Sequence, residues 1–253
     1  MKGQSSAARI KLSTAFRGGF FIKMSNKTDI PEEYQTGYAD FLGCRIDLSG
    51  RPLIPRPETE FWTRRAITDL AALDAAKIRV LDIFSGSGCV GVAVAKNLPL
   101  LLVDFSDIEA SAVEQARINC EINAIAPDRF RIFESDIFAG VPAGEYDAIL
   151  ANPPYIDLAK IGQVQKSVLD WEPHAALFAA GKGLALIEKF LKSAKNFLKP
   201  SGFIYMEFDP RQKRDIMEII KKENYPAAKF FKDQFGKWRF AKIFRQKSRA
   251  IRN

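Results

Sequence analysis

The sequence predicts an α/β fold in which seven strands form one mostly parallel sheet that ends in an antiparallel hairpin. From residue 78 onward, short apolar runs of strand length alternate with segments whose apolar residues recur at helical spacing. Strands separated by helices form right-handed crossovers and therefore parallel sheets. The last two runs are joined only by the tight turn Gln234-Phe235-Gly236, which fits an antiparallel edge hairpin. A chain of 253 residues is long enough for one large domain of this kind.

Each element follows from its local pattern. Runs rich in β-branched and aromatic residues predict strands, and helical spacing together with first-turn acids predicts helices, the first of which Pro57 opens. The strands are expected at Ile78–Phe84, Leu100–Asp104, Phe130–Glu134, Tyr146–Ala151, Gly202–Phe208, Ala227–Lys232 and Trp238–Phe244. The helices are expected at Glu58–Leu73, Val90–Asn97, Ile108–Asn123, Leu184–Leu198 and Arg211–Glu223, with an irregular insertion before Leu184.

Three parts are expected along the chain. Residues 1–37 predict a basic, irregular arm, residues 38–246 the globular domain, and residues 247–253 a basic tail. The domain should begin with a small hairpin between Tyr38 and Ile54, where two short runs surround glycines.

The N-terminal segment has a biased composition. Six lysines and arginines precede the first acidic residue, Asp29. Such a segment is typical of an organellar transit peptide, of a disordered arm, or of a chain whose true start is Met24. No apolar run approaches the roughly 18 residues that cross a bilayer, so we expect a soluble, cytoplasmic protein, with organellar import as the alternative.

The composition limits the kinds of partner, metal site and catalytic group that we expect in this protein. The net charge of +8 favours polyanionic partners such as RNA, ribosomes or anionic cofactors. The three cysteines lack any Cys-x-x-Cys spacing, which argues for a reducing compartment and against a disulfide framework. His174 is the single histidine. With so few nitrogen and sulfur ligands we expect no metal site, and histidine-based catalytic triads are nearly excluded.

A candidate ligand loop follows the first large strand. The run Val80–Gly88 leads a buried strand into a glycine turn that opens a helix, and glycines there let the backbone approach a ligand. The Gly-Lys-Ser/Thr of a phosphate loop is absent, and Asp82 favours a cationic ligand group over a pyrophosphate. We assign to this cofactor site Asp82, Phe84, Ser85, Gly86, Ser87 and Gly88, together with Asn152 at the end of the fourth strand.

Two further strand ends carry acids. Asp104 follows the glycines by about twenty residues, where a carboxylate can take both hydroxyls of a ribose. Asp136 and Ile137 follow the third strand and could flank an adenine. Amino-acid, ribose and base sites on successive strands suit S-adenosylmethionine better than a dinucleotide. The alternative is that these acids are helix caps or solvated loop residues.

The fourth strand ends at Asn152-Pro153-Pro154-Tyr155. The prolines fix φ and remove N–H donors, so the Asn152 side-chain oxygen and the Pro153 carbonyl can be held as neighbouring acceptors. Tyr155 supplies a flat face. This arrangement fits a planar group with an NH₂, whose nitrogen would be polarised and aimed at a methylsulfonium without a general base. The alternative is a simple turn that closes a strand.

These residues resemble the release-factor glutamine methyltransferase family (HemK/PrmC-like). The resemblance covers about Tyr38 to Phe244, and its most particular mark is the run Ile-Pro-Arg-Pro-Glu-Thr-Glu. The marks are Leu53–Glu60, Asn152–Ile156, Trp171-Glu172-Pro173, Ala176-Leu177-Phe178, Gly181-x-Gly183-Leu184, and Glu207 followed by Gln212.

The resemblance implies a Rossmann-like class I methyltransferase. It implies methyl transfer from S-adenosylmethionine to the side-chain nitrogen of the glutamine in the Gly-Gly-Gln motif of peptide-chain release factors. By this analogy Phe84–Gly88, Asp104 and Ile137 line the cofactor site, and Asn152–Tyr155 hold the glutamine. Two features depart from the family. The family usually has glycine in place of Phe84, and it usually carries an N-terminal helical substrate-binding domain. Here only some forty irregular residues precede the hairpin.

Two other functions stay open at this point. A DNA or RNA methyltransferase acting on an exocyclic amine would use the same turn on a flipped base, and the basic residues between 237 and 252 would suit it. A non-catalytic S-adenosylmethionine-binding accessory of translation is the other. The expected partner is a release factor, with ribosome or nucleic-acid proximity possible from the charge, no membrane, and a monomeric state.

Overall fold

The computed structural model describes residues 30–73, 77–142, 144 and 146–246. Its centre is a seven-stranded sheet with the order β10-β11-β9-β6-β3-β4-β5. The five strands from β9 to β5 in that order are parallel, and β11 pairs antiparallel with both β9 and β10. The predicted sheet and its C-terminal hairpin are therefore confirmed. The strands are β3 (Arg79–Ile83), β4 (Leu102–Asp107), β5 (Phe130–Glu134), β6 (Tyr146–Ala151), β9 (Leu198–Glu207), β10 (Ala227–Lys232) and β11 (Trp238–Phe244).

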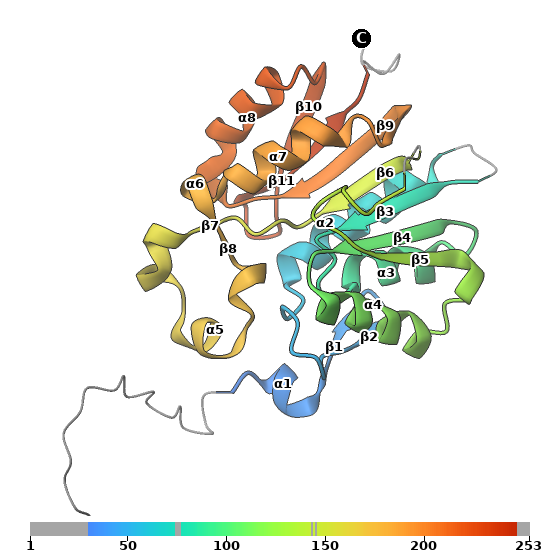
Figure 1. Cartoon of the computed structure of the whole chain (residues 1–253), viewed down its shortest axis with the longest axis vertical. Coiled ribbons are helices and arrows are strands. Elements are labelled where there is room, and N and C mark those ends of the chain that lie inside the picture. Colours follow the sequence, from blue (N-terminus) through green and yellow to red (C-terminus); the bar gives the residue numbers. More distant parts are fainter. Residues whose placement is uncertain (1–29, 74–76, 143, 145, 247–253) are drawn as a thin grey trace, which may run out of the picture.

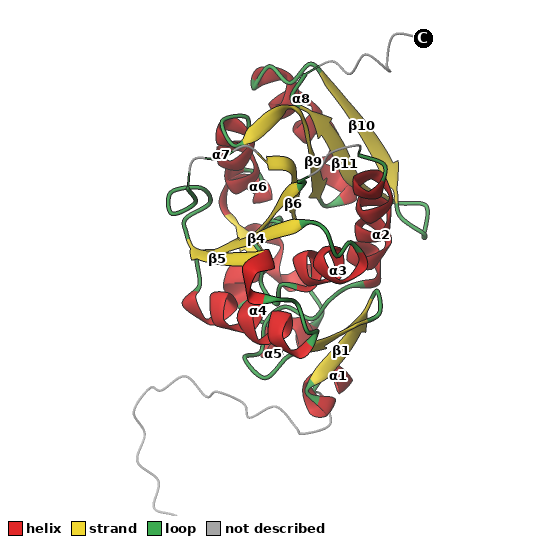
Figure 2. Ribbon diagram, turned by 90° about the vertical axis from the view of Figure 1, so that its right-hand side faces the viewer, coloured by secondary structure: helices red, strands yellow, loops and turns green. Residues whose placement is uncertain are grey.

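Helices cover both faces of the sheet (Figures 1 and 2). Successive side chains of a strand point to opposite faces: Val80 packs in a core with the helices of one layer, and Leu81 in a second core with those of the other. The first layer contains α2 (Pro57–Ala71), α3 (Cys89–Asn97) and α4 (Ala110–Ile122). The second contains α7 (Ala185–Ala194) and α8 (Lys213–Lys222). The result is a three-layer α/β domain.

Three element ends lie three or more residues from their predicted positions: the end of β4, the end of α7 and the start of β9. Strand β4 was expected to stop at Asp104, but it runs on to Asp107. Helix α7 was expected to reach Leu198, but it ends at Ala194, and Leu198 begins β9. Leu198 pairs with Tyr146 across a register shift, so the Lys-Pro-Ser-Gly segment that looks like a loop belongs to an irregular strand start.

The N-terminal hairpin consists of β1 (Tyr38–Phe41) and β2 (Cys44–Asp47), paired antiparallel. Side chains of α4 hold it in place: Asn119 Oδ1 accepts from the Asp47 N–H at 2.7 Å, and Asn123 Oδ1 from the Arg45 N–H at 3.1 Å. The last part of the arm that was expected to be irregular forms α1 (Glu32–Thr36). The rest of that arm, residues 1–29, and the tail, 247–253, lie outside the described residues.

The insertion between β6 and α7 packs beside the carboxyl ends of the strands, as the yellow and light-orange segment in Figure 1 shows. It contains β7 (Ile156–Asp157), α5 (Lys166–Trp171), β8 (Phe178–Ala179) and α6 (Ala180–Gly183), with β7 and β8 paired in parallel. Short 3-10 helices lie at Pro127–Arg129, Leu158–Gln163, His174–Ala176 and Pro210–Gln212. In the described part of the chain, no helix combines the length and apolar character that a membrane span requires.

Candidate active site

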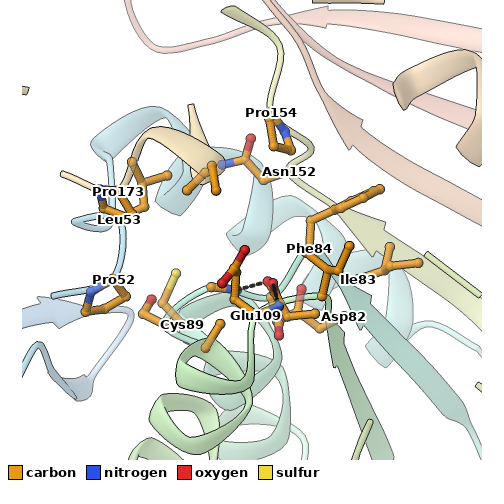
Figure 3. Close-up of a pocket in the computed structure, with 18 of the residues that line it drawn as sticks. Pro52, Leu53, Asp82, Ile83, Phe84, Cys89, Glu109, Asn152, Pro154 and Pro173 are labelled. Atoms are coloured by element: carbon orange, nitrogen blue, oxygen red, sulfur yellow. Dashed lines mark hydrogen bonds between the residues drawn. The ribbon is translucent and has the colours of Figure 1, made fainter. Parts of the chain in front are cut away.

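The strand order reverses between β3 and β6. The chain leaves β3 through β4 to β5 on one side and returns as β6 on the other side of β3. In open α/β sheets ligands bind at the carboxyl ends of the strands at such a point. A cavity of about 400 Å³ lies there (Figure 3). Of the residues predicted for the cofactor site, this cavity is lined by Asp82, Phe84, Ser85, Gly86, Ser87, Asp136, Ile137 and Asn152.

The glycine turn is built by close packing. The buried Asp82 carboxylate accepts a hydrogen bond of 2.8 Å from the Gly91 N–H, which ties β3 to the first turn of α3. A side chain at Gly91 would collide with the Phe105 ring, since a Cβ atom there would lie 2.3 Å from Phe105 Cε1. Gly88 has φ of +75° and touches Ala116 of α4, so it shapes the turn without lining the cavity.

Phe84 occupies an unusual conformation. Its φ is +60°, the left-handed region that favours glycine, at a cost of about 1–2 kcal/mol for other residues. The Phe84 ring packs edge-on against Phe190 of α7, with 5.7 Å between ring centroids. Glycine would adopt this backbone conformation without that cost, whereas Phe84 gains the contact with Phe190.

Asp104, which the sequence assigned to the cofactor site, is not among the residues that line the cavity. It sits in the middle of β4, 2% exposed, with its carboxylate engaged from several sides. Arg131 donates to both of its oxygens, at 3.0 and 2.6 Å, and the Tyr146 hydroxyl donates at 2.8 Å. Asp104 is a structural acid that links β4, β5 and β6.

Asp107, which the sequence reasoning missed, occupies the position expected of Asp104. It ends β4 and lines the cavity. Its carboxylate accepts the Gly86 N–H at 2.9 Å and the Glu109 N–H at 3.1 Å, so it also fixes the glycine turn. Burial raises the pKa of Asp107, and the N–H groups of Gly86 and Glu109 oppose that shift.

The cavity carries features of a site for a cationic, hydroxyl-rich ligand. Four carboxylates line it, from Asp82, Asp107, Glu109 and Asp136. The Ser85 hydroxyl, which also lines it, is buried without a hydrogen-bond partner in the described structure. Burial raises the pKa of Asp82 well above its usual range, so a neighbouring cation would stabilise the ionised carboxylate. Near the rim, Asp136 pairs with Lys189 at 2.7 Å, while Ile137 is buried.

The Asn-Pro-Pro-Tyr turn separates this cavity from a second one. Asn152 lines both. Pro154 lines the first, whereas Pro153 and Tyr155 line the second, a space of about 300 Å³ that is also bordered by Arg56, Lys160 and Arg211. The turn therefore stands between a pocket at the glycine loop and a second pocket beside the insertion. Of the four residues predicted to act together, Asn152 borders both cavities and each of the other three borders one.

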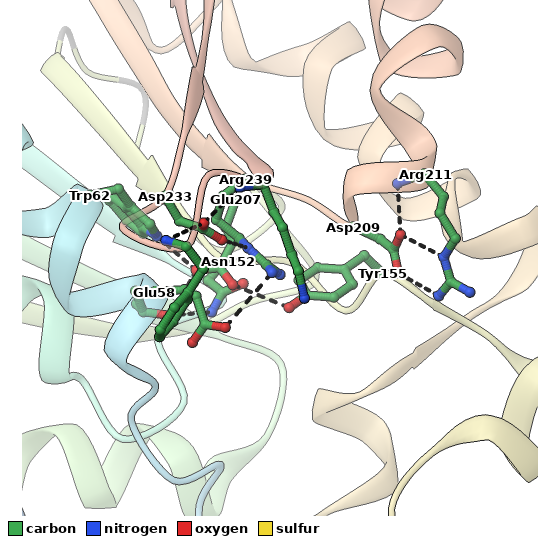
Figure 4. Close-up of polar contacts among 12 residues, drawn as sticks. Glu58, Trp62, Asn152, Tyr155, Glu207, Asp209, Arg211, Asp233 and Arg239 are labelled. Atoms are coloured by element: carbon green, nitrogen blue, oxygen red, sulfur yellow. Dashed lines mark hydrogen bonds and ion pairs between the residues drawn. The ribbon is translucent and has the colours of Figure 1, made fainter.

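A buried carboxylate supports this turn from behind. Glu207, at the end of β9, is 1% exposed and accepts hydrogen bonds from the Tyr155 hydroxyl at 3.1 Å and the Trp62 indole N–H at 2.7 Å (Figure 4). Burial raises the pKa of Glu207, while its hydrogen-bond donors and the nearby Arg239 guanidinium act in the opposite direction. Glu207 is one of the residues that carry the family resemblance, but the sequence alone does not indicate which side chains it contacts.

Comparisons with known proteins decide the family. The chain is 37% identical over 216 residues to a release factor glutamine methyltransferase of Streptococcus pneumoniae, covering 84% of this chain and 74% of that protein. It is 35% identical over 211 residues to the protein of that name from Bacteroides thetaiotaomicron, covering 82% and 73%. The chain belongs to the release factor glutamine methyltransferase family. The model of the methyltransferase small domain also matches residues 67–170.

Solved structures agree on the fold of this family member. A ribosomal protein L11 methylase from Lactobacillus delbrueckii subsp. bulgaricus superposes with a TM-score of 0.55 at 18% identity, covering 79% of this chain and 83% of that one. A methyltransferase from Pyrococcus furiosus gives a TM-score of 0.56 at 22% identity, covering 80% and 88%. The domain has the Rossmann-like class I methyltransferase fold.

The sequence marks of this methyltransferase meet in space. Arg56, from the Ile-Pro-Arg-Pro-Glu-Thr-Glu run, forms an ion pair with the buried Glu172 of the insertion. Glu172 also accepts from the Ile54 N–H at 3.4 Å. Arg56 borders both cavities. The ion pair thus fastens the insertion to the segment before α2, beside both cavities.

Gly183 permits the close approach that fixes Tyr155. It has φ of +78°, and a Cβ atom there would lie 1.9 Å from the Tyr155 carbonyl oxygen. That oxygen accepts a hydrogen bond of 2.9 Å from Gln212, another family mark. We expect Gly183→Ala to lower the free energy of unfolding by about 2–4 kcal/mol, because backbone atoms must move.

Denaturant unfolding measures this effect, and Gly181→Ala is the matched control. Gly181 also has a positive φ, +61°, but a Cβ there would meet only Ala185 Cβ at 3.4 Å. Both variants carry the same backbone strain, so only Gly183→Ala adds the collision. Equal stabilities of the two variants would contradict the role given to this contact.

Proposed function

We propose that this enzyme transfers a methyl group from S-adenosylmethionine to the side-chain amide nitrogen of a glutamine in a peptide-chain release factor, in its Gly-Gly-Gln motif. One observation carries the proposal: Asn152 lines both the cavity at the glycine loop and the second cavity. A cofactor in the first and a glutamine side chain in the second would meet at its amide. Membership of the release factor glutamine methyltransferase family supports this assignment.

The cofactor would be held by residues of three successive strand ends. Asp82 and the Ser85 hydroxyl face the amino-acid end, which is cationic. Asp107 replaces Asp104 as the acid for the ribose hydroxyls, through charge-assisted hydrogen bonds worth about 1.5–3 kcal/mol each. Asp136 and Ile137 border the place of the adenine. The glycine turn lets the ligand approach the backbone closely.

The protein's part in the chemistry is to orient and polarise an amide. When bound, S-adenosylmethionine supplies the methyl group on a sulfonium sulfur. Asn152 Oδ1 and the Pro153 carbonyl accept the two N–H hydrogens of the glutamine, which draws electron density onto its nitrogen and aims the lone pair. The Tyr155 ring faces the amide plane. As the nitrogen forms its bond to the methyl carbon, the bond from that carbon to sulfur breaks, and S-adenosylhomocysteine is left as the neutral thioether. The methylated nitrogen carries positive charge and is therefore acidic, so its extra proton can pass to water without a dedicated base.

The test is incubation with labelled S-adenosylmethionine and separate candidate acceptors: a release factor, tRNA, rRNA and DNA. We expect label in the release factor, on the glutamine of its Gly-Gly-Gln motif by peptide mass spectrometry. A release factor with that glutamine replaced by alanine should stay unlabelled. Label in nucleic acid alone would overturn the proposal. A cytoplasmic location, a monomeric state and proximity to the ribosome stay predictions.

A further inference from the structure

The Ile-Pro-Arg-Pro-Glu-Thr-Glu run, the most particular sequence mark of this protein, has no role in the chemistry proposed above. Thr59, in the Glu-Thr-Glu part of the run that opens α2, is 2% exposed and lines the first cavity. Its hydroxyl lies between two groups already described. It donates to Glu207 Oε2 at 2.7 Å, and it accepts from Asn152 Nδ2 at 3.4 Å. A hydrogen-bond chain therefore runs from Glu207 through Thr59 to Asn152.

Glu207 determines which group donates and which accepts in each hydrogen bond of this series. The Trp62 indole nitrogen can only donate, and it donates to the same Glu207 oxygen that Thr59 contacts. The hydrogen-bond donors around Glu207 and the nearby Arg239 guanidinium oppose the effect of burial and favour its ionised form, which has only acceptors to offer its neighbours. Thr59 must therefore spend its single hydroxyl hydrogen on Glu207, and it presents only lone pairs to Asn152.

Because the Thr59 oxygen offers only lone pairs, the Asn152 side-chain amide can face it in only one of its two orientations. The Asn152 NH₂ group must turn toward Thr59, because its oxygen would otherwise face the Thr59 oxygen with no hydrogen between them. Oδ1 then points away from Thr59 and is free of that hydroxyl, as the proposed function requires of the acceptor that meets the glutamine amide. The reversed amide would set its own N–H groups against those of the glutamine.

We propose that Thr59 and Glu207 are positioning residues that fix the Asn152 amide with its oxygen toward the methyl acceptor. The proposal rests on the proposed function, since it assumes that Asn152 accepts from a glutamine amide. It explains why a threonine at the start of α2 and a glutamate at the end of β9 accompany the Asn-Pro-Pro-Tyr turn. Neither touches the reacting atoms.

Substitutions of Thr59 test the hydrogen-bond chain. Thr59→Val removes the hydroxyl at constant shape, and kcat for methylation of the release factor should fall about tenfold. KM should change little, because the acceptor can still enter but is aligned in a smaller fraction of complexes. Thr59→Ser restores the hydroxyl and should recover most of the lost kcat.

Thr63→Val is the matched control. Thr63 lies one turn further along α2, is fully buried, and donates only to the Thr59 backbone carbonyl, at 2.8 Å. Both valine variants should melt cooperatively, with Thr59→Val somewhat less stable because it loses a bond to a buried carboxylate, and only Thr59→Val should lose kcat. Equal kcat values in an active background would overturn the inference and leave the proposed function intact. An inactive wild-type protein would instead count against the proposed function.

A measurement on the unmutated protein covers the case in which Thr59→Val does not fold. The Asn152 side-chain amide protons should show nuclear Overhauser contacts to the Thr59 side chain. Amide protons directed away from Thr59 would overturn the inference. Glu207→Gln adds a second check: its amide oxygen can still accept from Thr59 and Trp62, so it should lose less kcat than Glu207→Leu, which ends the chain.

Discussion

Replacing Asn152 by alanine should lower kcat for methyl transfer by at least about a hundredfold, the usual cost of losing a preorganised polar group in a transition state. The Asn152 amide oxygen is one of two acceptors available to the glutamine nitrogen in the proposed geometry. Its removal leaves one N–H of that nitrogen unpaired and its lone pair poorly aimed. Single-turnover assays with labelled S-adenosylmethionine and a release factor measure the loss.

Cofactor binding separates a catalytic effect from a collapsed site. The acids proposed to hold the cofactor, Asp82, Asp107 and Asp136, also line the first cavity and are unchanged in this variant, so the Kd of S-adenosylmethionine in calorimetry should stay within a few fold of that of the wild-type protein. Asn97→Ala is the control for loss of an asparagine amide elsewhere: Asn97 is an exposed residue of α3 that does not line the cavity, and its amide donates to backbone carbonyls. Full activity in Asn152→Ala would refute the role of the turn.

Local sequence patterns are sufficient to locate the parts of the candidate site that are formed by consecutive residues. The glycine turn after β3 and the Asn-Pro-Pro-Tyr turn after β6 carry their conformational requirements in their own residues, and both were located correctly. The same holds for the order of strands and helices, because alternation of elements and the short final turn determine a parallel sheet with a terminal hairpin.

Asp104 and Asp107 show where local patterns fail. An acid after Leu102 and Val103 suggests the end of a strand, because an unpaired buried carboxylate is costly. What lets Asp104 stay inside is Arg131, 27 positions away on β5. The sequence alone does not show that pairing. The contacts of Thr59 and Glu207, 148 positions apart, were beyond reach for the same reason.

Replacing Asp107 by alanine should weaken binding of S-adenosylmethionine by about ten- to a hundredfold, since charge-assisted bonds to the ribose hydroxyls are lost. Asp104→Ala is the informative comparison. It leaves Arg131 and the buried Tyr146 hydroxyl without their acceptor, so it should lower the free energy of unfolding by about 2–3 kcal/mol. Cofactor affinity of the folded protein should change less than in Asp107→Ala.

The weakened binding of Asp107→Ala has two components, because Asp107 also holds the Gly86 N–H. A ligand change separates them: the by-product S-adenosylhomocysteine is compared with its 2′-deoxy analogue. The wild-type protein should bind the deoxy compound about tenfold more weakly, whereas Asp107→Ala should bind the two nearly equally, because the missing hydroxyl has lost its partner. If the variant still discriminates as the wild type does, Asp107 only orders the glycine turn, and the ribose is held elsewhere.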